Sequence, residues 1–322
     1  MLRLGLLSTG RINREILRAA AATDRVEVVA VGSRDPSRAV AYAREHGILH
    51  AHGSYEELLA DDGVDAVYVS LPNGLHHPWT LRALEAGKHV LCEKPYSRRP
   101  AEVEEAFDVA DGAGLVLMEA FMYRHHPQVG IVKALVEGGR IGRLRHVRST
   151  FTFRLGGRDD VRLDRDLDGG ALMDVGCYCV SGSRLLAGEP ERALGESVVG
   201  ASGVDVGFAG MLRFAHDVIG QFHVSFLTPP QQELVAVGEE GTLVLGAPWR
   251  ADWGASLEVH RGREVERVPV PGADSYRLEL ENLADAIDGT APPILGRDDA
   301  LAQARVIDAL YRSADTGRSI AL

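Results

Sequence analysis

Lys94 is the residue of this sequence best placed to do chemistry. It stands in the run Glu93-Lys94-Pro95, directly after an apolar segment, residues 89–92, that has the composition of a buried strand. Because proline cannot continue a sheet ladder, the strand is expected to end where the cation begins. In open α/β sheets ligands bind beyond the carboxyl ends of the strands, which would bring the ammonium group within reach of one. The alternative is a solvated lysine that pairs with Glu93 in a turn.

A second candidate group follows the glycine pair at residues 169–170, where a helix is expected. Asp174 and Tyr178 are four residues apart, so they would share one face of that helix and could point at one substrate. A buried tyrosine whose hydroxyl the protein itself satisfies is the commoner meaning of such a residue. No tyrosine is followed four residues later by lysine. A tyrosine and a lysine could therefore cooperate only if the fold brings them together.

The chain opens with an apolar strand, residues 2–7, followed by a turn and a helix, which is the beginning of a βαβ unit. In such a turn, backbone N–H groups and a helix N-terminus can hold the pyrophosphate of a dinucleotide. The turn departs from the pattern G-x-G-x-x-G, because Ser8 and Asn13 stand where the first and third glycines would be. A plain strand–helix turn is the alternative. The cofactor-binding residues expected here are Ser8, Thr9, Gly10, Arg11 and Ile12.

The residues after the second expected strand indicate which dinucleotide would bind. An acidic side chain at that place would hydrogen-bond the ribose hydroxyls of NAD. This chain has Ser33 and Arg34, with Arg38 one helical turn further, and these offer a hydroxyl and two cations to a 2′-phosphate. Asp35 is expected to cap the helix that follows it. The sequence therefore predicts NADP in preference to NAD; the alternative is a pair of surface arginines at a helix start.

The remaining elements define the fold class. Strands and helices alternate through about the first 120 residues, which predicts a doubly wound parallel sheet. Later strands follow one another without helices between them, which predicts an antiparallel sheet with one face free. We therefore predict an α/β protein with a Rossmann domain over residues 1–122 and, over residues 123–322, an α/β domain with a large, mainly antiparallel open sheet. The expected strands are 2–7, 26–31, 66–71, 89–92, 115–118, 145–153, 211–214, 218–226, 234–237 and 242–245, and the main expected helices are 11–22, 78–86, 100–113, 127–137, 170–186, 276–287 and 298–313.

Composition and charge argue against several classes of protein. A net charge of -11 and a sequence pI near 5.6 disfavour nucleic acid and anionic membranes as partners. No stretch approaches 18 consecutive apolar residues, so no membrane span is predicted. Three cysteines give no even disulfide framework, which favours reduced thiols and a cytoplasmic location. The adjacent histidine pairs at 76–77 and 125–126 lack the spacing to cysteine or carboxylate that a zinc site needs, and no metal is predicted.

Several segments together resemble the glucose-fructose oxidoreductase, inositol dehydrogenase and rhizopine catabolism (Gfo/Idh/MocA) family. They are residues 4–12, 71–73, 86–95, 119–124 and 169–178, and the likeness as a whole spans nearly the entire chain. The resemblance implies a Rossmann domain followed by an α/β domain whose open sheet often makes the oligomer contact, here in a homodimer or homotetramer. Within the family the sequence is most similar to the branch of dihydrodiol dehydrogenases, NADP-dependent xylose dehydrogenases and sugar 3-ketoreductases, in which tyrosine replaces the usual catalytic histidine.

The resemblance also implies roles for single residues. Tyr178 occupies the catalytic position, with Lys94 and Asp174 as its catalytic and substrate-binding partners, and the Lys94–Pro95 bond is expected to be cis. Ser181 stands where family members usually carry aspartate or asparagine. Further cofactor-binding residues would be Leu71, Pro72, Asn73, His76, Glu93, Lys94 and Pro95, and further substrate-binding residues would be Tyr123 and Arg124. Arg158, in an arginine-rich stretch, is a further candidate for an anionic or polyhydroxylated substrate, although a solvated loop is an equal alternative.

These residues predict hydride transfer between nicotinamide and a sugar or polyol-like alcohol or carbonyl. Tyr178 would exchange the proton of the substrate oxygen, although a phenol ordinarily has a pKa near 10. The ammonium of Lys94 within about 4 Å would favour tyrosinate by at most about 4 kcal/mol, or roughly three pKa units, at an effective dielectric near 20. Free sugar, nucleotide-linked sugar and cyclic diol all stay open as substrates. The alternative function is a catalytically silent nucleotide-binding regulator or scaffold of the same fold.

Overall fold

The computed structural model describes residues 1–157 and 160–322, and these residues form two compact units. The first unit comprises residues 1–125 and 274–301, and the second comprises residues 126–273 and 302–322. The division predicted from the sequence, at residue 122, did not include the return of residues 274–301 to the first unit.

The first unit is built on a six-stranded parallel sheet in the order β3-β2-β1-β4-β5-β6. The order reverses between β1 and β4, and in doubly wound sheets a dinucleotide binds at this switch point, beyond the carboxyl ends of the strands. The predicted Rossmann sheet is therefore confirmed. Its strands are β1 (Leu2–Leu7), β2 (Val26–Gly32), β3 (His50–His52), β4 (Ala66–Val69), β5 (His89–Glu93) and β6 (Leu117–Ala120).

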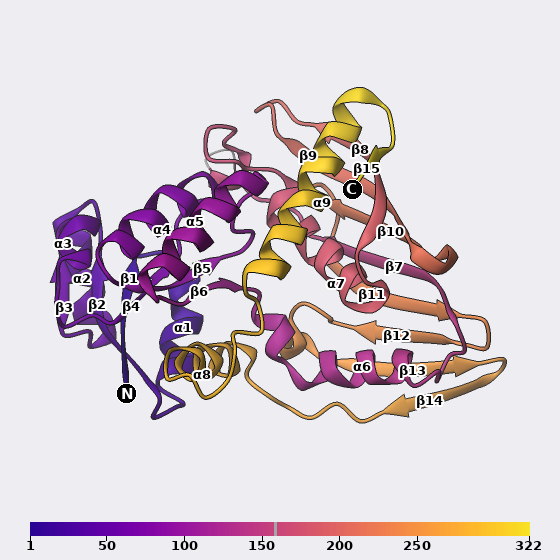
Figure 1. Ribbon diagram of the computed structural model, residues 1–322, viewed down its shortest axis with the longest axis horizontal. Helices are drawn as coiled ribbons and strands as arrows, with labels where there is room; N and C mark the ends of the chain where they lie inside the picture. Colours follow the sequence, from indigo (N-terminus) through magenta and orange to yellow (C-terminus); the bar gives the residue numbers. More distant parts are fainter. Residues whose placement is uncertain (158–159) are drawn as a thin grey trace. The chain divides into compact units, whose positions relative to one another are not determined.

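Helices cover both faces of this sheet. Right-handed crossovers run from β1 towards β2 in one direction and from β4 towards β6 in the other, which places their helices on opposite faces. In Figure 1, α4 and α5 accordingly lie side by side, whereas α1 lies beside α8, the helix contributed by the returning segment. The helices of this unit are α1 (Asn13–Ala20), α2 (Pro36–His46), α3 (Tyr55–Leu59), α4 (His76–Glu85), α5 (Pro100–Ala113) and α8 (Ser275–Ile287).

The helix cap predicted at Asp35 is present, and Ser54 provides a second one. Asp35 precedes α2, and its carboxylate accepts the backbone N–H groups of Ser37 and Arg38 at 2.9 and 3.3 Å. Ser54 caps α3 by accepting the N–H of Glu57 at 3.0 Å. The carboxylate of Glu57 reaches back to the N–H of Gly53 at 2.8 Å, one residue earlier than in a capping box.

The first unit differs from the prediction in several details. Strand β3 was not predicted, because it has only three residues and two of them are histidines. Strand β6 spans Leu117–Ala120 and not 115–118, and α4 begins at His76, two residues before the expected proline. A short apolar run identifies a strand, but it does not fix where its hydrogen-bonded ladder begins.

The second unit is built on a nine-stranded sheet in the order β14-β13-β12-β11-β7-β10-β9-β8-β15. Among its described pairs, β7 and β10 are parallel and the others are antiparallel, so the predicted, mainly antiparallel sheet is confirmed. Its strands are β7 (Leu144–Thr152), β8 (Pro190–Val199), β9 (Asp205–Phe214), β10 (Ile219–Ser225), β11 (Gln231–Gly238), β12 (Thr242–Gly246), β13 (Ser256–Arg261), β14 (Glu264–Val268) and β15 (Ile320–Ala321).

One face of this sheet is covered by α7 (Cys177–Ala187), which packs on β7, β10 and β11 (Figure 1). On the other face, β10 exposes alternate residues. Strands β8, β13, β14 and β15 were not predicted. Most residues of β8 and β14 are exposed, and β15 has only two residues. The unit also contains α6 (Pro127–Glu137) and most of α9 (Arg297–Thr316). Within the described residues, no helix is both long and apolar enough to cross a membrane.

Candidate active site and cofactor-binding edge

The turn after β1 incorporates both departures from the glycine pattern. Ser8 has φ of 149°, a region that favours glycine, and its hydroxyl is held by Ser70 Oγ at 2.8 Å and by the N–H of Gly10 at 3.0 Å. Asn13 is completely buried and its amide donates to the carbonyl oxygen of Ser8 at 2.7 Å. These side chains fix the turn that glycines would otherwise allow, and they tie it to the strand end at Ser70.

The same turn leads into a helix N-terminus that suits an anion. Ile12 stands at the N-cap of α1 without a side-chain cap, and the N–H groups of Asn13, Arg14 and Glu15 donate to the carbonyl oxygens of the turn, at residues 10–12. A Cβ at Gly10 would lie 3.1 Å from Ser8 Oγ and 3.5 Å from the carbonyl oxygen of Ser70, which makes glycine the residue that fits there. Thr9 is half-buried and Arg11 is exposed. The residues present fit a dinucleotide pyrophosphate.

The groups predicted to recognise a 2′-phosphate lie beside this turn. Arg38 donates through Nη2 to the hydroxyl of Thr9 at 3.1 Å, which joins α2 to the turn after β1. The hydroxyl of Ser33 accepts the N–H of Asp35 at 3.2 Å. Burial raises the pKa of Tyr55 above its usual value, and the charge of the neighbouring Arg34 offsets part of this rise. The carboxylate of Asp35 is engaged in capping α2, where hydrogen bonds lower its pKa.

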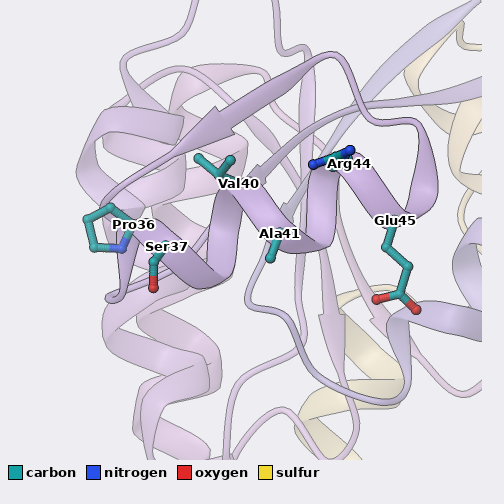
Figure 2. A pocket seen from close by; sticks show the side chains of 6 residues that line it. All are labelled: Pro36, Ser37, Val40, Ala41, Arg44 and Glu45. Carbon is teal, nitrogen blue, oxygen red and sulfur yellow. The ribbon is translucent and has the colours of Figure 1, made fainter.

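A surface hollow of about 820 Å³ follows the outer face of α2 (Figure 2). Its lining side chains recur at positions of one helical face, and none of them is a predicted catalytic or cofactor-binding residue. The hollow is lined by Pro36, Ser37, Val40, Ala41, Arg44 and Glu45.

Glu93 and Lys94 stand at the carboxyl end of β5, as predicted. The carboxylate of Glu93 accepts the N–H of Lys94 at 3.3 Å and the hydroxyl proton of Tyr68, a fully buried residue of β4. Glu279 of α8 is 1% exposed, and burial together with the charge of Glu93 raises its pKa well above the usual range. The base of this strand end is thus a buried acidic cluster that consists of Tyr68, Glu93 and Glu279.

His76 connects two of the predicted cofactor-binding segments. Its ring nitrogens lie 2.9 Å from the carbonyl oxygen of Pro95 and 2.8 Å from that of Leu71. The side chain is 1% exposed, and burial lowers its pKa to about 4, so the ring is neutral and donates to one carbonyl at a time. The Lys94–Pro95 peptide bond that His76 adjoins is cis, as expected.

The two other substrate-binding candidates of the first unit are largely buried. Tyr123 is 2% exposed and packs edge-to-face on Phe121, with ring centroids 6.0 Å apart. Arg124 forms an ion pair with Asp299 at 3.3 Å. Arg158, the candidate from the arginine-rich stretch, lies outside the described residues.

In the second unit, Tyr178 lies in an aromatic cluster near the start of α7. Its ring centroid is 5.5 Å from that of Phe151 and 5.9 Å from that of Trp249, and the residue is 7% exposed. Trp249 is fixed by a hydrogen bond from its indole nitrogen to the carbonyl oxygen of Thr150 at 3.1 Å. Ser181, one turn further, is completely buried.

Asp174 forms an ion pair that the sequence did not identify. Arg162 donates through Nε to the Asp174 carboxylate at 2.7 Å and through Nη1 to Asp160 at 3.2 Å, and the charge of Asp174 is the main cause that raises the pKa of Arg162. The only sequence signal was the density of arginine and aspartate between residues 154 and 168. The predicted helix over residues 170–186 is present, but its first turn, Leu172–Gly176, is π-helical and carries Asp174. Such turns are frequent at functional sites.

Steric contacts explain why glycine stands at residue 170, just before this turn. Gly170 has φ of 130°, and a Cβ there would overlap Oδ1 of Asp205 and lie 3.2 Å from the hydroxyl of Tyr311. Asp205 accepts the N–H of Leu172 at 2.7 Å and the hydroxyl of Tyr311 at 3.0 Å. Burial raises the pKa of Asp205 to about 6, against the effect of these hydrogen bonds. Asp205 thereby anchors the turn that carries Asp174.

Within each unit, the structure thus joins residues that the sequence singled out separately: Thr9 with Arg38, and His76 with the segments at Leu71 and Pro95. Lys94 belongs to the first unit, whereas Asp174 and Tyr178 belong to the second. The cooperation of Lys94 with Tyr178 stays a prediction.

Two family models match the chain, one in each unit. Residues 2–121 match an oxidoreductase family with an NAD-binding Rossmann fold, and residues 130–244 match the GFO/IDH/MocA C-terminal domain. A D-xylose 1-dehydrogenase (NADP(+)) of Haloferax volcanii is 41% identical over 99% of this chain and 99% of its own. The chain belongs to the Gfo/Idh/MocA family. The predicted family, fold and oxidoreductase class are confirmed.

Other members of the Gfo/Idh/MocA family are similar over most of the chain. The human trans-1,2-dihydrobenzene-1,2-diol dehydrogenase is 34% identical over 84% of this chain and 81% of its own. The crystal structure of a 3-ketoreductase from Actinomadura kijaniata, in complex with NADP and TDP-benzene, has a TM-score of 0.92 and 32% identity, and the similarity covers 97% of both chains.

Proposed function

We propose that this protein is an NADP-dependent oxidoreductase that interconverts an alcohol and a carbonyl on a sugar or polyol-like small molecule. The observation that carries the proposal is the position of Lys94 at the carboxyl end of β5, on the edge of a sheet whose β1 turn suits a pyrophosphate. The names of its relatives, a D-xylose dehydrogenase and a dihydrobenzenediol dehydrogenase, support a polyhydroxylated or cyclic diol substrate.

The preference for NADP is supported by the surroundings of Thr9. Arg38 already contacts the turn after β1, Arg34 and Ser33 lie at the end of β2, and Asp35 is occupied as a helix cap. The capping bonds of Asp35 go to one carboxylate oxygen, Oδ1, and hold that side chain at the start of α2. Cations beside the turn after β1 would instead pair with a 2′-phosphate.

The chemical roles follow from the properties of three side chains. The nicotinamide of the bound cofactor supplies or accepts the hydride. Tyr178 donates a proton to the carbonyl oxygen in the direction of reduction and accepts the hydroxyl proton in the direction of oxidation, and the ammonium of Lys94 stabilises the tyrosinate. Asp174, held by Arg162, orients a hydroxyl group of the substrate. The aromatic rings of Phe151 and Trp249 limit access of water to Tyr178.

The decisive experiment replaces the ammonium and keeps the length of the side chain. Lys94→Met is expected to reduce turnover more than 100-fold, because the proton acceptor loses its electrostatic support, while NADPH fluorescence still reports binding. Lys133→Met is the matched control, since Lys133 is half-exposed on α6 near Glu137 and has no part in the proposed chemistry. Turnover of Lys94→Met above about a tenth of the unmodified rate would contradict the assignment.

A screen of aldoses, nucleotide-linked keto-sugars and cyclic diols, followed by NADPH absorbance, would identify the substrate. The alternative function, a catalytically silent regulator that binds the nucleotide, predicts NADPH binding without oxidation or reduction of any of these compounds. A rate that depends on both Lys94 and Tyr178 would exclude that alternative.

The proposal includes a cytoplasmic, homo-oligomeric protein whose first domain binds the cofactor and whose second domain binds the substrate. Oligomer contact through the second sheet is supported by apolar side chains on its open face. Leu194 and Met211 are cross-strand neighbours and are 39% and 46% exposed, and Ile219 is 36% exposed. Sedimentation of the purified chain would show whether a dimer or tetramer forms.

A further inference from the structure

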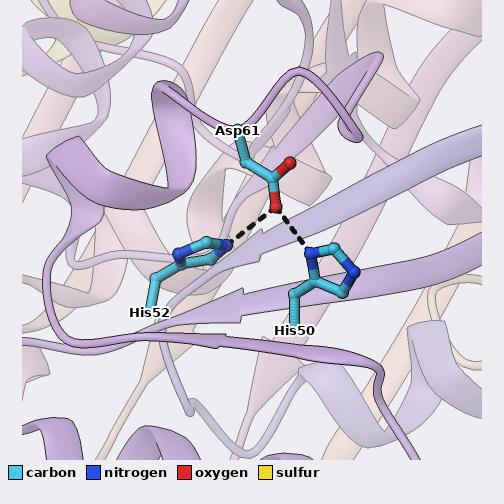
Figure 3. Close-up of side chains that lie close together, drawn as sticks. All are labelled: His50, His52 and Asp61. Carbon is cyan, nitrogen blue, oxygen red and sulfur yellow. Dashed lines mark hydrogen bonds and ion pairs between the residues drawn. The ribbon is translucent and has the colours of Figure 1, made fainter.

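Three side chains with metal-binding chemistry meet at the outer edge of the first sheet. His50 and His52 are two residues apart on the edge strand β3, so both point to the same face of that strand. Asp61 follows α3. Figure 3 shows its Oδ2 between the two rings, 2.9 Å from Nδ1 of His50 and 2.9 Å from Nε2 of His52. One donor atom from each residue lies within 4.8 Å of the other two.

We propose that His50, His52 and Asp61 bind a divalent zinc ion. Two imidazole nitrogens and one carboxylate oxygen form a usual ligand set for this cation, with metal–ligand bonds of about 2.0 to 2.2 Å. Ligand atoms at tetrahedral corners would then be about 3.3 Å apart. The nitrogen–oxygen separations of 2.9 Å differ from this by only a few tenths of an ångström. The two ring nitrogens lie within 4.8 Å of each other, so rotation of the side chains would bring all three donor atoms onto one cation.

The carboxylate is already positioned and ionised. Its other oxygen accepts the N–H of Gly63 at 2.7 Å, and Lys88 holds the surrounding loop by donating to the carbonyl oxygens of Asp61 and Val64 at 2.9 and 2.8 Å. Burial would raise the pKa of Asp61, but hydrogen bonds from Gly63 and the two histidines lower it to about 2. Such supporting contacts keep a ligand in place before the metal arrives.

The proton balance of binding is simple. An ionised carboxylate only accepts hydrogen bonds, so in the metal-free state Nδ1 of His50 and Nε2 of His52 donate to it and each of these nitrogens carries a proton. On binding, the proton of each ring moves to its other nitrogen, and the freed lone pair coordinates the cation. His50 is 51% exposed at its side chain, whereas His52 and Asp61 are 20% and 14% exposed. The cation can therefore enter from the side of His50, and a water molecule completes its coordination.

The donor set narrows the choice of cation. Mg²⁺ and Ca²⁺ prefer oxygen ligands, whereas imidazole nitrogens suit Zn²⁺. Cu²⁺ binds such a site more tightly than Zn²⁺, so metal availability decides between these two. None of the predicted cofactor-binding or catalytic residues contributes a ligand. Binding would fasten the edge strand β3 to the loop after α3, and it would stabilise the folded state because the unfolded chain does not hold the three ligands together.

The test uses the full chain without a histidine tag, treated with chelator and then titrated with Zn²⁺ by calorimetry, with Co²⁺ absorbance as a second probe. We expect one ion per chain, a Kd below about 100 μM, and a rise in Tm. His50→Gln and His52→Gln should each weaken binding at least tenfold, and the double variant should abolish it. His260→Gln is the matched control, since His260 also contacts a carboxylate, that of Glu258 at 3.0 Å, and should bind normally.

Three results would overturn the proposal: no saturable binding of Zn²⁺, unchanged binding in the double variant, or equally tight binding of Mg²⁺. Because the readout is binding and not turnover, it does not depend on the proposed enzymatic function. His50→Gln changes a half-exposed ring at the surface and should keep the fold. Its circular dichroism spectrum, compared with that of the unmodified chain, separates loss of a ligand from loss of structure.

Discussion

Removal of the Arg38 side chain is the sharpest test of cofactor choice. Arg38 is an exposed residue in the first turn of α2, and its guanidinium contacts Thr9 at 3.1 Å in the turn after β1. In the proposed complex it would face the 2′-phosphate of NADP, a group that NAD lacks. Arg38→Ala should therefore weaken NADPH binding and leave NADH binding nearly unchanged.

The size of the effect follows from the exposure of the side chain. Two unit charges about 4 Å apart attract by about 1 kcal/mol in bulk water and about 4 kcal/mol at an effective dielectric of 20. A charge-assisted hydrogen bond at a surface contributes about 1.5 to 3 kcal/mol. The expected loss of NADPH affinity is therefore about 10-fold to 150-fold. For NADH we expect less than about a threefold change, since only the contact with Thr9 is lost.

The assay is a fluorescence titration of both reduced cofactors at fixed ionic strength. Arg44→Ala, on the exposed side of the same helix, removes the same charge at a distance from Thr9 and controls for the general field of the protein. Arg34→Ala should give the same selective loss as Arg38→Ala. Equal losses for NADPH and NADH, or an equal effect of Arg44→Ala, would refute the recognition of a 2′-phosphate at the end of β2.

Three further predictions concern the buried carboxyl groups and the glycine turn. The folded-state pKa of Asp205, about 6, lies above the ordinary value of 3.8, so the neutral carboxyl stabilises the fold below pH 4. About 3 kcal/mol of this stability is lost as the pH rises through 6. Asp205→Asn should remove this dependence of the free energy of unfolding on pH in urea unfolding, and an unchanged dependence would contradict the assignment. Burial and the charge of Glu93 raise the pKa of Glu279 well above its usual range, so its neutral form stabilises the fold at low pH and this stability falls as the pH rises. Glu279→Gln should remove that fall in urea unfolding, and an unchanged pH dependence would show that ionisation of Glu279 does not contribute. Gly170→Ala should lower the free energy of unfolding by more than about 3 kcal/mol, because the added Cβ would meet the Asp205 carboxylate. Gly254→Ala, at φ of 106° in open space, should lower it by only about 1 to 2 kcal/mol. Comparable losses of the two variants in thermal unfolding would show that backbone strain alone accounts for both.

Local patterns in the sequence were sufficient to predict much of the first unit. The cap at Asp35 and the strand end at Glu93 depend on neighbouring residues, and both were found. The same was true of the turn after β1, although the sequence could not show why Ser8 and Asn13 replace glycine. Their role depends on hydrogen bonds to each other's segments and to Ser70, which is 62 residues from Ser8. Such contacts have no local signature.

The parts that the sequence missed share a physical cause. Strand β8 is held by pairing with β9 and β15, and its own residues alternate poorly, so its strand propensity is supplied by its neighbours. The π-helical turn before α7 is fixed by the carboxylate of Asp205 from a distant strand. The ion pair between Arg162 and Asp174 lies in a segment where several arginines and aspartates offer equally plausible partners. Tertiary structure selects one partner among these.

Because residues 274–301 belong to the first unit, this unit cannot be completed until nearly the whole chain has been synthesised. Asn282 bonds His125, the carbonyl oxygen of Leu295 accepts the N–H of Glu119, and Asp285 pairs with Arg25. At about 5 to 20 residues per second, roughly 7 to 30 s pass at the ribosome between the emergence of residue 125 and that of residue 274. During that interval residues 1–125 lack the packing and hydrogen bonds that α8 and the following segment supply, so a fragment ending near residue 125 should be less stable than the complete first unit.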